Sequence, residues 1–402
     1  MSLPVLTLIV ALAAAAVAAA AAIGRSDQPK VVVARGVTDG SFHPIAGGFV
    51  PDGTKIEDCG TDMRCLEQGF GNLAYTAGPA AALARFDRTR MVDKTVAVDC
   101  HRIAHMIGSA ALRRLHGNVA EAFSRGSSSC ASGYYHGILE RAFSHVRSKR
   151  GLIRAARRLC RGAGVRRRGF LDYQCTHGLG HGLMIQTGFD VPSALWMCSR
   201  LATRWDDVTC AGGVFMENGS TVYGIRSHWL KDDDALYPCA VVKLRDRAAC
   251  YLRVTTQMLR VNGYDWAKAA QTCRGVSLKW RRYCFRSFGR DAVEHTQEDA
   301  GAILRLCRLV GSAGGDCLYA AARTMANRQA TTSGAAALCR IAPARERPPC
   351  FAGLGVVVGL LQATDAGRAR ACARLTQSRM QARACTRAAR AEVEPNGRQA
   401  WG

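Results

Sequence analysis

The spacing of the cysteines is the feature that most constrains the fold of this chain. There are 18 of them in 402 residues, and from Cys198 onward they come in pairs whose members lie 10 to 13 residues apart. The first members of successive pairs are 32 to 41 residues apart, which indicates an internal repeat of about 34 residues, a length typical of helical-hairpin arrays. The pairs are Cys198/Cys210, Cys239/Cys250, Cys273/Cys284, Cys307/Cys317, Cys339/Cys350 and Cys372/Cys385.

The amino-acid sequence of each repeat fits two helices joined by a loop that a disulfide closes. An apolar stretch, SGAAALC, ends at Cys339, and the polar loop RIAPARERPP follows it. Cys350 then opens the apolar stretch CFAGLGVVVGLL. A disulfide across such a loop would connect two antiparallel helices, and each closure of this length is worth on the order of 3 kcal/mol in the loop-entropy model.

The same pattern extends towards the N-terminus. Cys160/Cys175, Cys100/Cys130 and Cys59/Cys65 are the remaining candidate pairs, which makes nine bridges in total. No Cys-x-x-Cys pair occurs, and this argues against structural zinc sites built from thiolates. A long exported chain with so many cysteines normally holds disulfides, so we expect an extracytoplasmic protein.

We therefore predict an all-α fold, an array of disulfide-stapled antiparallel helical hairpins that is solenoid-like with a period of about 34 residues. A hydrophobic fraction of 48% with only 7% aromatic residues suits closely packed helices better than a β-sandwich. In period and stapling alone, the pattern resembles solenoids of the tetratricopeptide and Sel-like type. The tryptophan, glycine and tyrosine signatures of those families are absent.

The chain divides into five segments by composition. Residues 3–23 carry no charge, so residues 1–24 are predicted to be a signal peptide or an N-terminal membrane anchor. Residues 25–55 are predicted to be a linker, 56–228 a histidine-rich helical domain, 229–391 a run of Cys-paired helical repeats, and 392–402 a disordered tail.

Two histidines occupy the same position in neighbouring repeats. His136 lies six residues after Cys130, and His181 lies six residues after Cys175. Equivalent positions of a helical array stack on one face, about 10 Å apart or less. Glycines three residues after each cysteine would allow the helices to approach still more closely.

Three successive predicted helices each carry two histidine or glutamate side chains four residues apart: His101 and His105, His136 and Glu140, and His177 and His181. Side chains at i and i+4 lie on the same face of a helix, so each helix offers two ligands on one face. Imidazole and carboxylate groups arranged in this way on facing helices build zinc, iron and copper sites, so we predict a site for one or two such divalent ions. The predicted metal ligands are His101, His105, His136, Glu140, His177 and His181, and Glu140 and Glu217 are the candidate catalytic acid–base residues.

Other interpretations of the histidines stay open. They can be structural, bonded to backbone groups or to Tyr134 and Tyr135 on a polar inner surface. They can also hold a noncovalent haem, whereas the absence of Cys-x-x-Cys-His disfavours covalent haem. No His-Glu-x-x-His motif occurs, so a hydrolase would need its general base from another helix, at Glu140 or Glu217.

The formal net charge of +24 has two interpretations. A basic surface can face an anionic cell-envelope surface or a protein partner. Alternatively, the charge reflects codon bias, since arginine supplies 47 of the 55 basic residues and is scattered; this second interpretation is favoured. No nucleic-acid-binding motif is visible, so a nucleic-acid partner is not expected. Membrane contact would come through residues 3–23 if they are not cleaved.

Together these features predict an extracytoplasmic metal-binding helical-repeat protein, either a metalloenzyme that uses a His/Glu cluster or a protein that carries metal without turnover. The alternative is a non-catalytic envelope interaction scaffold whose histidines are structural.

Overall fold

The computed structural model describes residues 32–33, 49–127, 129–144, 146, 148–161, 165–219 and 225–393. Within these residues the chain is all-helical, apart from one short parallel pairing of β1 (Val32–Val33) with β2 (Ile225–Arg226). The predicted signal or anchor, most of the predicted linker and nearly all of the predicted tail lie outside the described residues. None of the described helices is both long and apolar enough to cross a membrane.

The helices of the N-terminal half precede Ser220. They are η1 (Ile56–Asp58), α2 (Met63–Thr76), α3 (Pro79–Val92), α4 (Lys94–Val98), α5 (Cys100–Arg114), α6 (Val119–Ser124), α7 (Ser129–Phe143), α8 (Lys149–Leu159), α9 (Phe170–Gln186), α10 (Val191–Cys198) and α11 (Arg204–Gly219).

The helices of the C-terminal half follow β2. They are α12 (Arg247–Tyr251), α13 (Val254–Val261), α14 (Trp266–Gly275), α15 (Leu278–His295), α16 (Ala300–Arg308), η2 (Gly311–Ala313), α17 (Gly314–Gln329), α18 (Ser333–Ile341), α19 (Arg347–Leu361), α20 (Asp365–Leu375) and α21 (Arg379–Val393).

All nine predicted disulfides are present, and no described cysteine is free. Such a density of disulfides is typical of an oxidising compartment outside the cytoplasm. Two details differ from prediction. The second helix of most pairs begins several residues before the second cysteine, and Cys239 lies in a turn rather than at the end of a helix. The finer prediction, a solenoid with a period of about 34 residues, stays a prediction.

Side-chain caps set several of the helix starts. Asp265 accepts a hydrogen bond from the backbone N–H of Lys268, and Asp299 accepts one from Ala302. Thr364 caps α20 in the same way. Such caps satisfy backbone donors that the first turn of a helix leaves unpaired.

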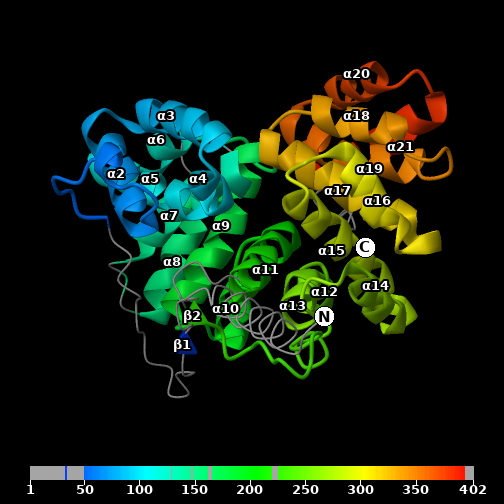
Figure 1. The fold of residues 1–402 in the computed structure, drawn as a ribbon, viewed down its shortest axis with the longest axis horizontal. Helices are drawn as coiled ribbons and strands as arrows, with labels where there is room; N and C mark the ends of the chain where they lie inside the picture. The colour runs from blue at the N-terminus through cyan, green and yellow to red at the C-terminus, as the bar shows by residue number, and fades with distance from the viewer. Residues whose placement is uncertain are drawn as a thin grey trace, which may run out of the picture.

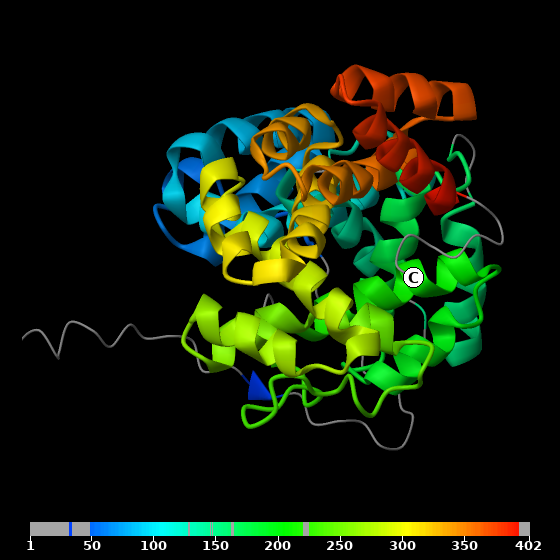
Figure 2. The same ribbon diagram turned by 90° about the vertical axis from the view of Figure 1, so that its right-hand side faces the viewer.

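Long helices that follow one another in the chain are also neighbours in space. Contacts run from α2 through α5, α7, α9 and α11, and from α15 through α17, α19 and α21. The C-terminal helices then return to the N-terminal half, where α17 contacts α7 and α19 contacts α9 (Figures 1 and 2). The C-terminal half therefore packs against the N-terminal half through these helices.

Helix α9 lies at the centre of the molecule. Every residue from Asp172 to Gln186 is buried, as expected for a helix that packs on all sides. One hydrophobic cluster extends from Phe49 to Ala389 and so includes both halves.

Two ends of predicted segments are packed rather than free. Phe49, assigned to the linker, is buried, and its carbonyl oxygen accepts hydrogen bonds from Arg113 and Arg141. Glu392, assigned to the tail, is also buried in α21. The described chain is thus folded on both sides of the boundaries predicted at residues 55 and 392.

Glycines bring neighbouring helices into backbone contact. A Cβ atom at Gly137 would overlap the carbonyl oxygen of His105, and one at Gly213 would overlap the carbonyl oxygen of His177. Only glycine permits this approach of α7 to α5 and of α11 to α9. The result is that side chains on these helices lie much closer together than ordinary helix packing allows.

Candidate metal centre

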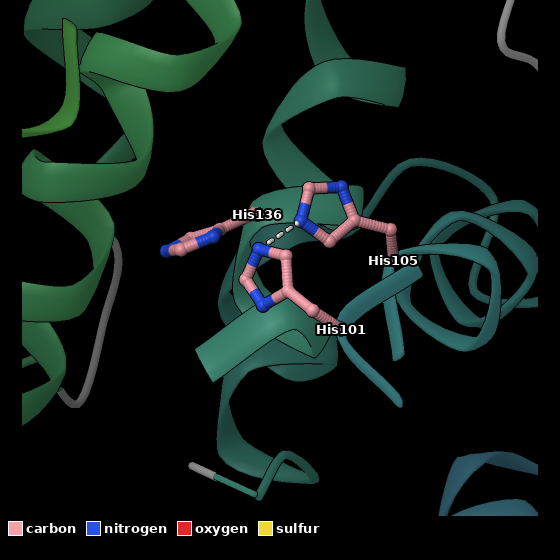
Figure 3. Close-up of side chains that lie close together, drawn as sticks. All are labelled: His101, His105 and His136. Carbon is pink, nitrogen blue, oxygen red and sulfur yellow. Dashed lines mark hydrogen bonds between the residues drawn. The ribbon is translucent and has the colours of Figure 1, made fainter. Parts of the chain in front are cut away.

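Two histidines of α5 form the first part of the site. The carbonyl oxygen of Cys130 accepts a hydrogen bond from Nδ1 of His101 at 2.7 Å, and a carboxylate oxygen of Glu140 lies 2.7 Å from Nδ1 of His105. The two Nε2 atoms face each other at 2.9 Å (Figure 3). We call His101, His105 and Glu140 the first half-site.

Two histidines of α9 repeat this arrangement. Nδ1 of His177 donates to the carbonyl oxygen of Thr209 at 3.3 Å, and Nδ1 of His181 lies 2.7 Å from a carboxylate oxygen of Glu217. Their Nε2 atoms are 3.4 Å apart. We call His177, His181 and Glu217 the second half-site. In both half-sites the next long helix supplies the carbonyl and the carboxylate that hold the rings.

His136 of α7 stands between the two half-sites. Its ring centroid lies 5.3 and 5.5 Å from those of His101 and His105, and 5.7 and 4.1 Å from those of His177 and His181. It stacks on His181 with an angle of 21° between the rings. Only 1% of His136 is exposed, and neither ring nitrogen has a hydrogen-bond partner among the described residues.

The five histidines form two groups of three. His101, His105 and His136 make one group, and His136, His177 and His181 make the other. In each group one nitrogen per ring lies within 4.8 Å of the others, so either group could hold a metal ion. His136 belongs to both groups.

Burial keeps most of these rings neutral. It lowers the pKa of His101, His136 and His177 well below the usual value, and it lowers the pKa of His181 to about 3. The charges of neighbouring histidines act in the same direction. Neutral imidazole is the form that binds metal, so the site is prepared for ligation at neutral pH.

One group in each half-site has a raised pKa: His105 in the first and Glu217 in the second. Burial also opposes a charge on His105, but the adjacent Glu140 carboxylate outweighs it and raises the pKa of His105. In the second half-site, burial raises the pKa of Glu217 to about 7. Only 3% of the Glu217 side chain is exposed, which is why burial favours its neutral form.

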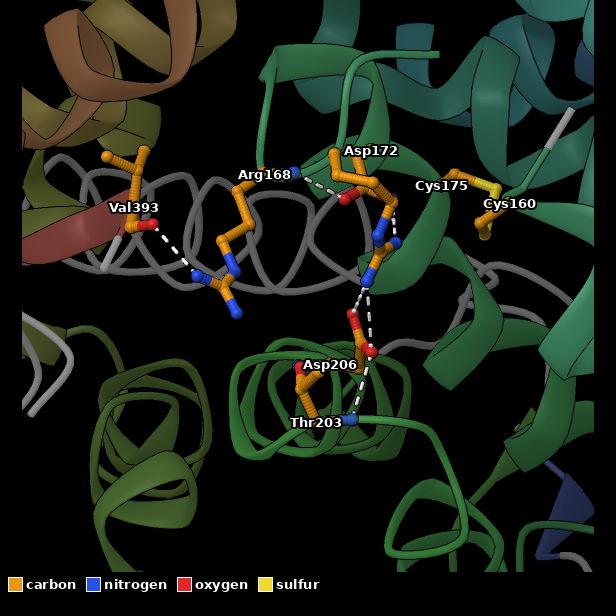
Figure 4. Close-up of polar contacts among 8 residues, drawn as sticks. Cys160, Arg168, Asp172, Cys175, Thr203, Asp206 and Val393 are labelled. Carbon is orange, nitrogen blue, oxygen red and sulfur yellow. Dashed lines mark hydrogen bonds and ion pairs between the residues drawn. A yellow bond between two sulfur atoms is a disulfide. The ribbon is translucent and has the colours of Figure 1, made fainter. Parts of the chain in front are cut away.

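Different contacts fix the helices of each half-site. The disulfide Cys100–Cys130 joins α5 directly to α7. No disulfide joins α9 to α11. Instead, Arg167 contacts a carboxylate oxygen of Asp172 on α9 at 2.7 Å and one of Asp206 on α11 at 2.8 Å, as part of the polar network in Figure 4.

A cavity of about 1120 Å³ borders the histidines. His101, His181 and Glu217 form part of its wall, and residues of α15 and α17 form the opposite part, among them Arg290, Glu294 and Arg328. Exposed residues such as Met91 and Gln329 line its outer part. Glu140 does not line this cavity.

The structure brings together every residue predicted as a metal ligand or acid–base group. Glu140 and Glu217 contact histidine Nδ1 atoms, and their predicted roles as ligand or base stay predictions. Tyr134, named as an alternative partner for the histidines, donates instead to the carbonyl oxygen of Ala122. Sequence reasoning missed the carbonyl groups that orient His101 and His177, for which side-chain patterns hold no signal.

Sequence reasoning also missed the arginines of the cavity wall. For Arg290 a signal was present, because it lies six residues after Cys284, the position that His136 and His181 occupy in their own repeats.

Comparisons with protein-family models, curated proteins and solved structures find no match to this chain. The function must therefore be argued from the site itself.

Proposed function

We propose that this chain is an extracytoplasmic metalloenzyme of the helical-repeat type, in which five buried histidines bind divalent transition-metal ions beside a substrate cavity. Zinc, iron and copper are the ions that such a ligand set suits. The observation that carries the proposal is the orientation of the four paired histidines, each held at Nδ1 with its Nε2 turned towards another histidine.

The hydrogen bonds at Nδ1 leave a lone pair on Nε2 of His101 and of His177, and each lone pair needs either a proton or a metal ion opposite it. A carbonyl oxygen can only accept, so Nδ1 of His101 and His177 must carry the proton, and Nε2 of each carries a lone pair. Each of these lone pairs faces the Nε2 atom of a second histidine. A proton must lie between them, or a metal ion must take its place.

The distances and the carboxylates support an ion. With metal–nitrogen bonds of about 2.0–2.1 Å, two ligand nitrogens lie roughly 3.3 Å apart on a tetrahedral ion and roughly 2.9 Å apart at a right angle. The two Nε2–Nε2 distances are 3.4 and 2.9 Å. Histidine ligands of metals characteristically use their other nitrogen to contact a carboxylate or a carbonyl group, as all four do here.

We infer two ions, one in each group of three histidines, with the imidazole of His136 between them. Both nitrogens of that ring are buried without a partner, and burial of an unpaired polar atom is costly unless something satisfies it. A ring with one ion at each nitrogen would satisfy both atoms, and it would do so as the imidazolate, with its N–H proton released to solvent when the second ion binds.

The cavity supports turnover rather than storage. A storage or purely structural site encloses its ion, whereas here His101, His181 and Glu217 border a space large enough for a substrate. Glu217 is the better placed of the two predicted acid–base residues, because it lines the cavity, and a pKa of about 7 suits a group that exchanges protons at neutral pH. An ion beside it would supply Lewis-acid or redox chemistry.

The finer architecture belongs to the same proposal. We infer that the stapled hairpins form a solenoid with a period of about 34 residues, since the predicted disulfides and the neighbour order of the long helices agree with it. Contact of the basic exterior with an anionic cell-envelope surface or a protein partner stays a prediction, and codon bias stays the favoured interpretation of the charge.

Metal content tests the proposal. Protein produced without a histidine tag should contain about two metal ions per chain by elemental analysis, and the double variant His136→Ala/His181→Ala should contain none. The matched control His116→Asn changes an exposed histidine outside the site, at a backbone conformation that asparagine accepts, and should retain both ions.

A structural role for the histidines makes a different prediction. In that case the wild-type protein contains no metal, and chelator changes the melting temperature of neither the wild type nor the double variant, although the loss of two buried side chains lowers that of the variant. This result would reject the metal centre and leave the interaction scaffold.

A further inference from the structure

A second, smaller cavity adjoins the histidine site on its C-terminal side. Its volume is about 80 Å³, and His177 and Tyr173 of α9 form one side of it. The residues that line both cavities are Met216, Arg290, Glu294 and Arg328, so the two spaces are neighbours. A ligand that extends between them would lie against the histidines at one end.

Arginines dominate the far side of this smaller cavity. Five of them line it: Arg253, Arg286, Arg290, Arg323 and Arg328. Carboxylates balance three of these charges, because Asp316 contacts Arg286 at 3.0 Å, Asp291 contacts Arg290 at 2.6 Å and Glu298 contacts Arg328 at 2.9 Å.

Arg253 has no such carboxylate. It forms no ion pair with any described residue, and its single hydrogen bond, to the carbonyl oxygen of Gly212, is long at 3.4 Å. Burial, together with the charge of Arg290, lowers the pKa of Arg253 to about 9. A cation held in these surroundings is stabilised by any anion that enters the cavity.

Arg290 adds a second unsatisfied donor. Only 8% of this residue is exposed, and its Nε has no hydrogen-bond partner among the described residues. Its Nη2 donates to Thr256 at 2.8 Å. Because Arg290 lines both cavities, a group bound to it also lies within the space that the histidines border.

The repeat explains why the arginines and histidines share one space. The residue six positions after the second cysteine lines one or both cavities in five successive repeats. These residues are His181, Met216, Thr256, Arg290 and Arg323. The position six residues after the second cysteine is therefore a metal-ligating histidine in an N-terminal repeat, His181, and an arginine suited to bind anions in two C-terminal repeats, Arg290 and Arg323.

We propose that Arg253 and Arg290 bind an oxyanion, the carboxylate or phosphate group of a small organic molecule whose remainder extends towards the histidines. The planar guanidinium group binds both anions through paired hydrogen bonds. Tyr173 and Tyr319 line the same cavity and add aromatic surface to its wall. That this anion is the substrate of the metal centre rests on the proposed function; the binding of the anion does not.

Calorimetric titration of the full chain tests the anion site. Benzoate and phenyl phosphate are the anionic probes, and benzamide is their neutral counterpart. At least one of the two anions should bind ten-fold or more tightly than benzamide. Arg253→Gln should weaken that binding at least ten-fold without changing the melting temperature, because it leaves no carboxylate unpaired.

Two further variants make the test specific. Arg290→Gln should weaken anion binding in the same way, and Arg308→Gln, which changes an exposed arginine of α16 outside both cavities, should not. Equal affinity for benzamide and both anions, or an Arg253→Gln variant that binds them as the wild type does, would overturn the proposal.

Metal analysis of the same samples separates the two proposals. Protein that holds metal but binds neither anion rejects the anion site alone. Protein that holds no metal but binds an anion through Arg253 rejects the metal centre and supports the anion site.

Discussion

The two half-sites hold the same ligands by different means. In the first, a covalent bond between Cys100 and Cys130 joins the two helices that supply the histidines and the carboxylate. In the second, Arg167 holds α9 and α11 together through two buried aspartates. The comparison shows that two similar pairs of imidazoles are held at helix crossings that are connected in one case by a disulfide and in the other by ion pairs from a partly exposed arginine.

Removal of these two connections should have the largest effect. Arg167→Met leaves Asp172 and Asp206 without their cation, and because 43% of the Arg167 side chain is exposed, we expect a cost of about 1–3 kcal/mol, as for a buried acceptor that loses one partner. We expect a decrease of this size in the free energy of unfolding, measured by urea denaturation, and loss of metal from the second half-site only. Arg158→Met, at an exposed position, is the control.

The equivalent change in the first half-site is Cys100→Ala/Cys130→Ala. By the loop-entropy model a closure of this length contributes about 3–4 kcal/mol, so urea denaturation should report a similar decrease. Metal should then leave the first half-site only. If either variant lost both ions equally, the half-sites would not be independently supported.

His136→Ala should weaken both half-sites at once. Each ion loses one of three imidazole ligands, and we expect its affinity to fall about 100-fold, equivalent to about 3 kcal/mol per ion. Competition with a chelator measures this affinity. His101→Ala is the matched variant and should affect the first ion alone; weakening of a single ion by His136→Ala would show that the ring is not shared.

The two carboxylates should have smaller effects. Loss of a carboxylate that orients a histidine ligand typically costs 10–100-fold in metal affinity, and we expect this for both Glu140→Gln and Glu217→Gln. Their pH dependence should differ. Glu217 has a pKa of about 7, so the second ion should bind more tightly as the pH rises through 7, and Glu217→Gln should abolish this increase.

The metal-free protein should show the smallest effect, a gradual dependence of stability on pH. The pKa values of His101, His136 and His177 are lower in the folded chain than in the unfolded chain, so their stabilising contribution is complete above pH 6.5 and is lost as the pH falls.

His181 and Glu217 add little to this slope. The lowered pKa of His181 and the raised pKa of Glu217 act in opposite directions between pH 4.5 and 6.5, so their effects cancel. Thermal melts in chelator at several pH values measure the net slope. A melting temperature that stayed constant from pH 6.5 to 5 would contradict the neutral state of these histidines.

Much of the fold was predictable because the cysteines mark each repeat twice. Their spacing identified the disulfides from Cys160 onward, since a short polar loop between two apolar stretches leaves one near neighbour for each cysteine, whereas Cys59–Cys65 and Cys100–Cys130 were candidate pairs whose connectivity the spacing left open. Helix starts were less predictable: caps such as Asp265 and Asp299 decide the starts of first helices locally, and the second helices α15, α17 and α19 begin before their cysteine with no side-chain cap. A backbone donor satisfied by a side chain begins the helix wherever that side chain lies, independently of the cysteine.

The histidine cluster was predictable for a related reason. Spacings of four and one shared repeat position placed the rings on facing helices, and the ring centroids of His136 and His181 are indeed only 4.1 Å apart. The partners at Nδ1 were not predictable, because they depend on the rotation of α7 and α11 about their axes. The position of Arg290 and Arg328 opposite the histidines was not predictable either. It depends on the contact of α17 with α7, which joins distant parts of the chain and is specified by no local pattern.

That return of α17 to α7 has a consequence for the order in which the protein matures. A chain synthesised only as far as Glu217 already contains every histidine and both glutamates of the two half-sites, yet it lacks Arg253 and Arg290. An ion captured by such an intermediate would stand open to bulk water and to competing chelators. Under the proposed function, selection among substrates therefore begins only when the C-terminal helices have packed against the N-terminal half. Truncations that keep every metal ligand should still produce an enzyme, but one that does not select among substrates.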